Sequence, residues 1–76
     1  MIHELKTTSK YFQEMFMCHK TFEVRKNDRN FQNGDTLILK EWNGEQYTGR
    51  MMARTVNYIL EGGQFGIEEG YVVMSI

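Results

Sequence analysis

The sequence contains a single cysteine, almost no net charge and no long apolar segment. Cys18 alone cannot form an internal disulfide, and no Cys/His cluster has the spacing of a zinc site. No apolar run approaches the roughly 20 residues that span a bilayer, and no secretory signal is present. We therefore expect a cytoplasmic protein without metal or cofactor. A net charge of −1 excludes the overall basic field of a non-specific nucleic-acid binder.

The chain of 76 residues is long enough for one domain, residues 1–76, with one small core. A core of this size rarely leaves more than about 3–5 kcal/mol of net stability. Stability must therefore come from packing, from closure of a sheet or from a second subunit. A homodimer through an apolar edge of the last strand and a monomer both stay open.

The start of the chain alternates apolar and polar side chains over residues 2–6. This pattern predicts a short strand with His3 and Leu5 on one face. We expect His3 to be solvated or hydrogen-bonded there, not to bind a metal. Thr7-Thr8-Ser9 follows and supplies N-cap candidates for a helix, because a hydroxyl can accept from a free helix N–H.

A short amphipathic helix is predicted from Lys10 to about Cys18. Its large side chains recur at helical spacing at Phe12, Met15, Phe16 and His19. Because so short a helix is marginal alone, we expect it to pack this stripe on a sheet. The helix must end near Cys18 without the glycine that usually adopts a left-handed conformation there.

The rest of the chain is rich in strand signals. Residues 36–42 form one predicted strand, and Asn43-Gly44 is a strong hairpin turn. Residues 47–60 are expected to form one long second arm, with Gly49 as a bulge or bend. Residues 71–76 end the chain as a strand. The sequence thus predicts a mostly β (α+β) fold, a small barrel of about five strands with one N-terminal helix.

Charged side chains are densest in the segment Lys20-Thr-Phe-Glu-Val-Arg-Lys-Asn-Asp-Arg29. Strand parity places Glu23 and Arg25 on the face opposite Phe22 and Val24. The segment carries four basic and two acidic residues, whereas residues 61–76 carry three acidic residues and no basic one. We therefore expect an anionic ligand to meet this segment. Lys20 and Glu23 converge only if the backbone bends near Thr21.

Several segments together resemble a small bacterial and phage family without an assigned function, often described as RNA-binding and similar to the ASCH group of the PUA-like superfamily. The segments that carry the resemblance are His3–Lys6, Tyr11-Phe12, Lys20–Arg29, Gly34-Asp35, Tyr47–Arg50, Tyr58–Ile67 and Gly70–Val73. The resemblance implies a PUA-like pseudo-barrel of about five strands, a helix across one opening, and a cleft beside the helix lined by the Lys20–Arg25 strand.

The sequence departs from this family at three positions. Relatives usually place glycine where Cys18 stands and often proline where Ser9 stands, and both positions concern the helix boundaries. Some ASCH proteins resemble hydrolases that remove an acyl group from acetylated cytidine with a lysine, a threonine three residues later and a distant glutamate. Lys20 matches that lysine, but Glu23 occupies the position of the threonine, which weakens the amidohydrolase hypothesis.

Three hypotheses follow for the charged segment. In the first, RNA or a nucleotide binds through phosphate contacts to basic side chains, while Glu23 accepts from an exocyclic amine and Phe31, Tyr58 or Phe65 stacks on a base. In the second, Lys20 and Glu23 are catalytic, with Glu23 as general acid/base. In the third, Glu23 only forms an ion pair with Arg25 or Arg54 at a barrel rim, or the domain binds a protein. The predicted binding residues are Lys20, Glu23, Arg25, Lys26, Arg29, Arg54 and Tyr58.

Overall fold

Six strands and one short helix follow one another in a computed structural model that describes all 76 residues. In chain order the elements are β1 (Ile2–Thr8), α1 (Ser9–Phe16), β2 (Phe22–Lys26), β3 (Thr36–Trp42), β4 (Tyr47–Thr55), β5 (Tyr58–Glu61) and β6 (Tyr71–Ser75). The mostly β fold with one N-terminal helix is confirmed. No helix has the length and apolar character needed to cross a membrane.

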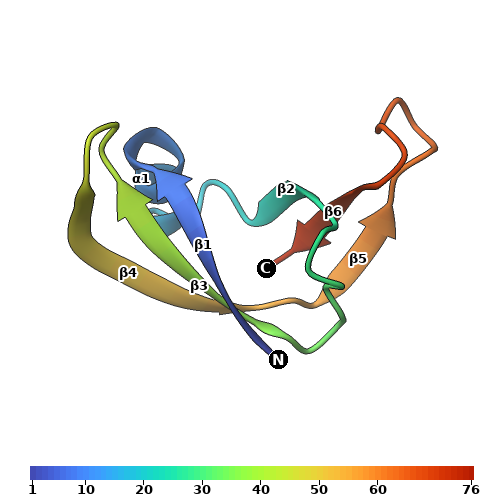
Figure 1. Cartoon of the computed structure of the whole chain (residues 1–76), viewed down its shortest axis with the longest axis horizontal. Helices are drawn as coiled ribbons and strands as arrows, with labels where there is room; N and C mark the ends of the chain where they lie inside the picture. Colours follow the sequence, from blue (N-terminus) through green and yellow to red (C-terminus); the bar gives the residue numbers. More distant parts are fainter.

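The strands form two three-stranded sheets, β1-β3-β4 and β2-β6-β5. β1 runs parallel to β3, and all other pairs are antiparallel. The sheets lie side by side, with α1 beside β1 and the 62–70 loop at the opposite end (Figure 1). β6 is the central strand of its sheet, so the last strand has no free edge for the apolar contact that we expected in a dimer.

The predicted single arm over residues 47–60 is wrong, because the chain changes sheets within it. Val56 is buried, and its N–H donates to the Asp35 carbonyl while its carbonyl accepts from the N–H of Gly34. These contacts to a distant turn remove residues 56–57 from the ladder and separate β4 from β5. The structure therefore has six strands instead of about five.

The expected irregularity at Gly49 is present. The register between β3 and β4 shifts between Lys40 and Trp42, where the single residue Glu41 lies opposite three residues of β4. Gly49 is in the middle of this bulge with φ of +93°. The bulge brings both Thr48 and Arg50 onto the Glu41 carboxylate.

No closed barrel forms, so the expected closure is not confirmed. β1 and β2 are end strands of their sheets, and no backbone hydrogen bond joins them. Side chains span this seam between the free edges of β1 and β2: Arg25 Nη2 donates to the Lys6 carbonyl at 2.9 Å, and Arg29 Nη1 donates to the Glu4 carbonyl at 2.7 Å.

The core lies between the inward faces of the two sheets and beneath the helix. Its buried cluster contains Leu5, Met15, Phe31, Leu37, Leu39, Val56, Val72 and Met74. The predicted helical stripe is correct for Phe12 and Met15, which are buried, but wrong for Phe16 and His19, which are exposed. The helix ends at Phe16, and Cys18 takes the left-handed conformation itself with φ of +61°. That turn points His19 away from the core.

Candidate functional site

A cleft of about 780 Å³ lies where the free edges of β1 and β2 face each other beside α1. β1 contributes one wall, α1 another, and the Lys20–Arg25 segment the third. This is the arrangement that the sequence resemblance implied for the Lys20–Arg25 strand. The lining residues are Lys6, Thr7, Thr8, Lys10, Tyr11, Glu14, His19, Lys20, Phe22, Glu23, Val24 and Arg25.

Glu23 provides a buried carboxylate in this lining. Its exposed fraction is 4%, and each oxygen accepts from a different cation. Lys20 Nζ donates to Oε1 at 3.0 Å, and Arg25 Nε donates to Oε2 at 2.6 Å. Lys20 and Glu23 converge because the strand begins at Phe22, not at Lys20, so strand parity does not relate them. Burying a carboxylate is costly without partners, and these two cations compensate its charge.

The polarity of β2 is inverted relative to an ordinary half-buried strand. The alternation that we predicted is present, but Glu23 faces the interior while Phe22 and Val24 are 46% and 53% exposed. Register explains the inversion, because Glu23 pairs with the fully buried Met74 of β6, and opposed residues share a face. A strand with its carboxylate inward and its apolar side chains outward is better suited to a site than to a core.

Two aromatic rings stand beside the Lys20 ammonium. Lys20 Nζ lies 5.4 Å from the centroid of the Tyr11 ring on α1 and 4.9 Å from that of Phe22 on β2. Both rings are about half exposed. The cleft therefore contains two half-exposed aromatic rings, one from α1 and one from β2, and such rings can stack on a flat ligand.

The net charge of the cleft is opposite in sign to that of the whole chain. Lys6, Lys10, Lys20 and Arg25 line it with Glu14 and Glu23, a surplus of two positive charges, whereas the chain carries −1. The sum over the sequence hides this local field. A cleft lined by a surplus of one charge favours groups of the opposite sign.

The structure gathers only part of the predicted site. Lys20, Glu23 and Arg25 line the cleft. Lys26 and Arg29 lie instead beside a smaller hollow of about 180 Å³ that also contacts Asp28 and Phe31. Their distance from the cleft follows from the turn after β2, which carries the chain along the seam.

The other predicted contacts also lie outside the cleft lining. Arg54 donates to the backbone carbonyls of Met15 and Ala53, so it supports the helix end and does not pair with Glu23. Tyr58 is exposed on β5, across β6 from Phe22. Phe31 is a core residue, and Phe65 is exposed in the 62–70 loop.

Sequence reasoning missed six lining residues before the charged segment: Lys6, Thr7, Thr8, Lys10, Tyr11 and Glu14. They come from β1 and α1, which we had interpreted only as structural elements. For Thr7 a signal was available, since it continues the period-two pattern of His3 and Leu5 if the first strand extends to residue 8. Thr7 is one of the three predicted N-cap candidates, but it lies in β1, and the observed N-cap residue Thr8 makes no side-chain capping bond.

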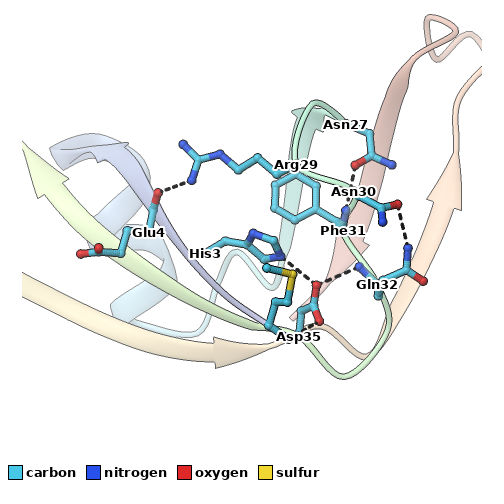
Figure 2. A network of polar contacts seen from close by, with 9 residues as sticks. His3, Glu4, Asn27, Arg29, Asn30, Phe31, Gln32 and Asp35 are labelled. Carbon is cyan, nitrogen blue, oxygen red and sulfur yellow. Dashed lines mark hydrogen bonds and ion pairs between the residues drawn. The ribbon is translucent and has the colours of Figure 1, made fainter.

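Two further buried carboxylates anchor strands away from the cleft. Asp35 accepts from the N-terminal ammonium at 2.8 Å, from His3 Nε2 at 2.8 Å and from the Gln32 N–H at 3.0 Å (Figure 2). These three donors, the ammonium first, hold the pKa of Asp35 far below its ordinary value. His3 is thus hydrogen-bonded, as we expected.

Glu41 forms the second anchor, at the β4 bulge. Arg50 donates through Nε and Nη2, each at 2.9 Å, and Thr48 Oγ1 donates at 2.6 Å. Chiefly through the Arg50 bonds and then the Thr48 bond, the pKa of Glu41 falls to about 2. The same pairing raises the pKa of Arg50. The Arg50 guanidinium also lies 5.1 Å from the centroid of Phe12, which joins the hairpin to the helix.

Comparison with known proteins confirms the resemblance to a family without an assigned function and with a phage member. A family model described as a domain of unknown function, DUF3850, matches residues 2–76. An uncharacterized 12.9 kDa protein encoded in the GpA 3′ region of Escherichia phage P2 is 42% identical over 60 residues, which are 79% of this chain. The match spans 55% of the phage protein, so the chain corresponds to about half of that relative's length. Because the family model covers nearly the whole chain, the protein belongs to the DUF3850 family.

Proposed function

We propose that the cleft between β1, α1 and β2 binds a nucleotide, either free or as part of single-stranded RNA. The observation that carries the proposal is the combination of a local surplus of two positive charges with two accessible aromatic rings around a neutralised carboxylate. The positive charges suit a phosphate, the aromatic rings suit an unstacked base, and the carboxylate suits the polar edge of that base. The resemblance to ASCH and PUA-like proteins supports the same proposal.

The four cations that line the cleft differ in whether they already form hydrogen bonds within the protein. Arg25 is already engaged by Glu23 and by the Lys6 carbonyl, and Lys20 by Glu23 and the Phe22 carbonyl. Lys6 and Lys10 make no ion pair; their ammonium groups lie over the rings of Trp42 and Tyr11. We therefore assign the phosphate contact to Lys6 and Lys10, and assign Lys20 and Arg25 to holding Glu23.

The hydrolase hypothesis receives less support from this geometry. The hydrolases that the sequence resembles use a threonine, and Glu23 occupies its position. The Lys20 ammonium donates to that carboxylate and to the Phe22 carbonyl, not to a hydroxyl nucleophile. Release of acetate from acetylated cytidine that disappears in Lys20→Ala would restore this alternative.

Binding can be tested by titrating the protein with the four ribonucleoside 5′-monophosphates and with short single-stranded RNA at 50 and 200 mM salt. We expect affinity that falls with salt, because counterions are released from the phosphates. Lys10→Ala should weaken binding, whereas Lys40→Ala should not. Lys40→Ala is the matched control because it removes the same charge from a lysine that does not line the cleft. Lys40 instead contacts Glu4 and Tyr47. Equal loss in both variants, or no binding by wild type, would refute the proposal.

A further inference from the structure

We propose that the hydroxyl of Thr7 is the specificity contact of the cleft, and that it binds the polar edge of a nucleobase whose phosphate lies at Lys6 and Lys10. This inference rests on the proposed function and extends it, because it assigns an orientation to the ligand and a contact to a residue so far described only as part of a strand.

The Thr7 hydroxyl stands out by its lack of a partner. Thr7 is 3% exposed and lines the cleft, yet its Oγ1 is the one buried side-chain nitrogen or oxygen in the structure without a hydrogen bond. Buried polar groups are nearly always hydrogen-bonded, since an unpaired one is destabilising. The other buried polar side chains obey this rule, as Asp35 and Glu41 each accept several bonds. Since Thr7 lines the cleft, its unpartnered hydroxyl is explained if a bound ligand completes the hydrogen bond.

Glu23 and Lys20 line the same cleft as Thr7, and they show which ligand group the cleft suits. Each Glu23 oxygen accepts one bond and retains acceptor capacity, and the Lys20 ammonium uses two of its three N–H groups. Thr7 can donate or accept. The cleft lining therefore presents donors and acceptors together, as the edge of a nucleobase does.

A phosphate group does not fit the same place. It offers only acceptors at neutral pH, and the Glu23 carboxylate would repel it. The ammonium groups of Lys6 and Lys10 have no carboxylate partner and line the same cleft. A nucleotide therefore fits with its base toward Thr7 and Glu23. Its phosphate then lies toward Lys6 and Lys10.

Paired variants and paired probes test the inference. Thr7→Val removes the hydroxyl with little change of shape, Thr7→Ser retains it, and Lys10→Ala removes only the phosphate contact. Each is titrated by calorimetry with the four ribonucleosides and with their 5′-monophosphates. For the probe that wild type binds best, we expect Thr7→Val to weaken nucleoside and monophosphate alike, by about tenfold, and Thr7→Ser by far less. Lys10→Ala should weaken the monophosphate and spare the nucleoside.

A melting curve separates a binding role from a structural one. Because the Thr7 hydroxyl makes no bond within the protein, Thr7→Val should melt at the wild-type temperature or above it. A lower Tm would mean that the hydroxyl serves the fold, and would overturn the inference. If wild type binds and Thr7→Val binds as tightly, the inference fails while the proposed function stands. If Thr7→Val weakens only the monophosphate, the assigned orientation is reversed. If wild type binds no probe, the proposed function itself fails.

Discussion

Replacing Glu23 by glutamine tests whether the inward carboxylate of β2 holds the cleft together. Glutamine keeps the shape of the side chain but removes its charge. Its NH₂ group is a donor and would face either Lys20 or Arg25, which are donors themselves. One of the two charge-assisted bonds, from Lys20 or Arg25, must therefore be lost. A hydrogen bond to a charged group contributes about 1.5–3 kcal/mol.

The magnitude follows from the exposure of the two cations. Breaking a fully buried ion pair costs about 3–5 kcal/mol. The side chains of Lys20 and Arg25 keep 18% and 28% of their surface in water, which lowers that penalty. We expect Glu23→Gln to reduce the free energy of unfolding by about 2–3 kcal/mol. For a domain of this size the loss corresponds to a fall in Tm of roughly 10–20 °C.

Urea unfolding at pH 7, followed by circular dichroism, measures this loss. Glu45→Gln is the matched control, since it makes the same chemical change on an exposed side chain of the β3–β4 hairpin. That control should change stability by less than about 0.5 kcal/mol. If Glu23→Gln and Glu45→Gln unfold at the same urea concentration, the Lys20–Glu23–Arg25 cluster does not stabilise the domain, and the assignment of structural duties to Lys20 and Arg25 is wrong.

Three further predictions concern the fold. The pKa values of Asp35 and Glu41 are depressed, the latter to about 2, so the folded chain binds fewer protons in acid than the unfolded chain. The free energy of unfolding should therefore be highest above the ordinary carboxyl pKa values near 4 and should fall as the pH drops toward 2. Urea midpoints measured across that pH range test this. Phe12→Ala should lower the free energy of unfolding by about 3–5 kcal/mol, since the side chain is 1% exposed; this is as much as a core of this size supplies, so the variant should be largely unfolded in circular dichroism without urea, whereas alanine at the exposed Phe65 should leave the spectrum unchanged. Cys18→Gly should raise the free energy of unfolding by about 1 kcal/mol, because a non-glycine residue is strained at φ of +61°; an unchanged urea midpoint would contradict this.

Sequence periodicity was sufficient wherever one face of an element is apolar and buried. The first strand, the 36–42 strand and the last strand follow their alternation, because His3, Leu5, Leu37, Leu39 and the inward residues of β6 all lie on faces that the core needs. Periodicity failed where contacts with a distant segment determine the backbone conformation. Val56 leaves the ladder because of the Asp35 turn, a contact that no local pattern reveals.

The candidate site was half predictable for a similar reason. Charge density identified Lys20, Glu23 and Arg25, since so many ionised groups on one short strand are conspicuous. The inward direction of Glu23 depends on the register with β6, and the membership of Thr7 and Tyr11 depends on β1 and α1 meeting β2 in space. Residues such as Thr7 and Tyr11 join the site because their elements pack against β2, and nothing in the local sequence reveals that packing.

The seam between β1 and β2 divides the backbone hydrogen bonds into two independent sets. Guanidinium groups fasten it, through Arg25 and Arg29, and no backbone ladder crosses it. The two sheets are therefore held together by side chains, through the two guanidinium bonds and through the buried cluster to which both sheets contribute. The position of one sheet against the other thus depends on side-chain packing, whereas each ladder depends on backbone hydrogen bonds.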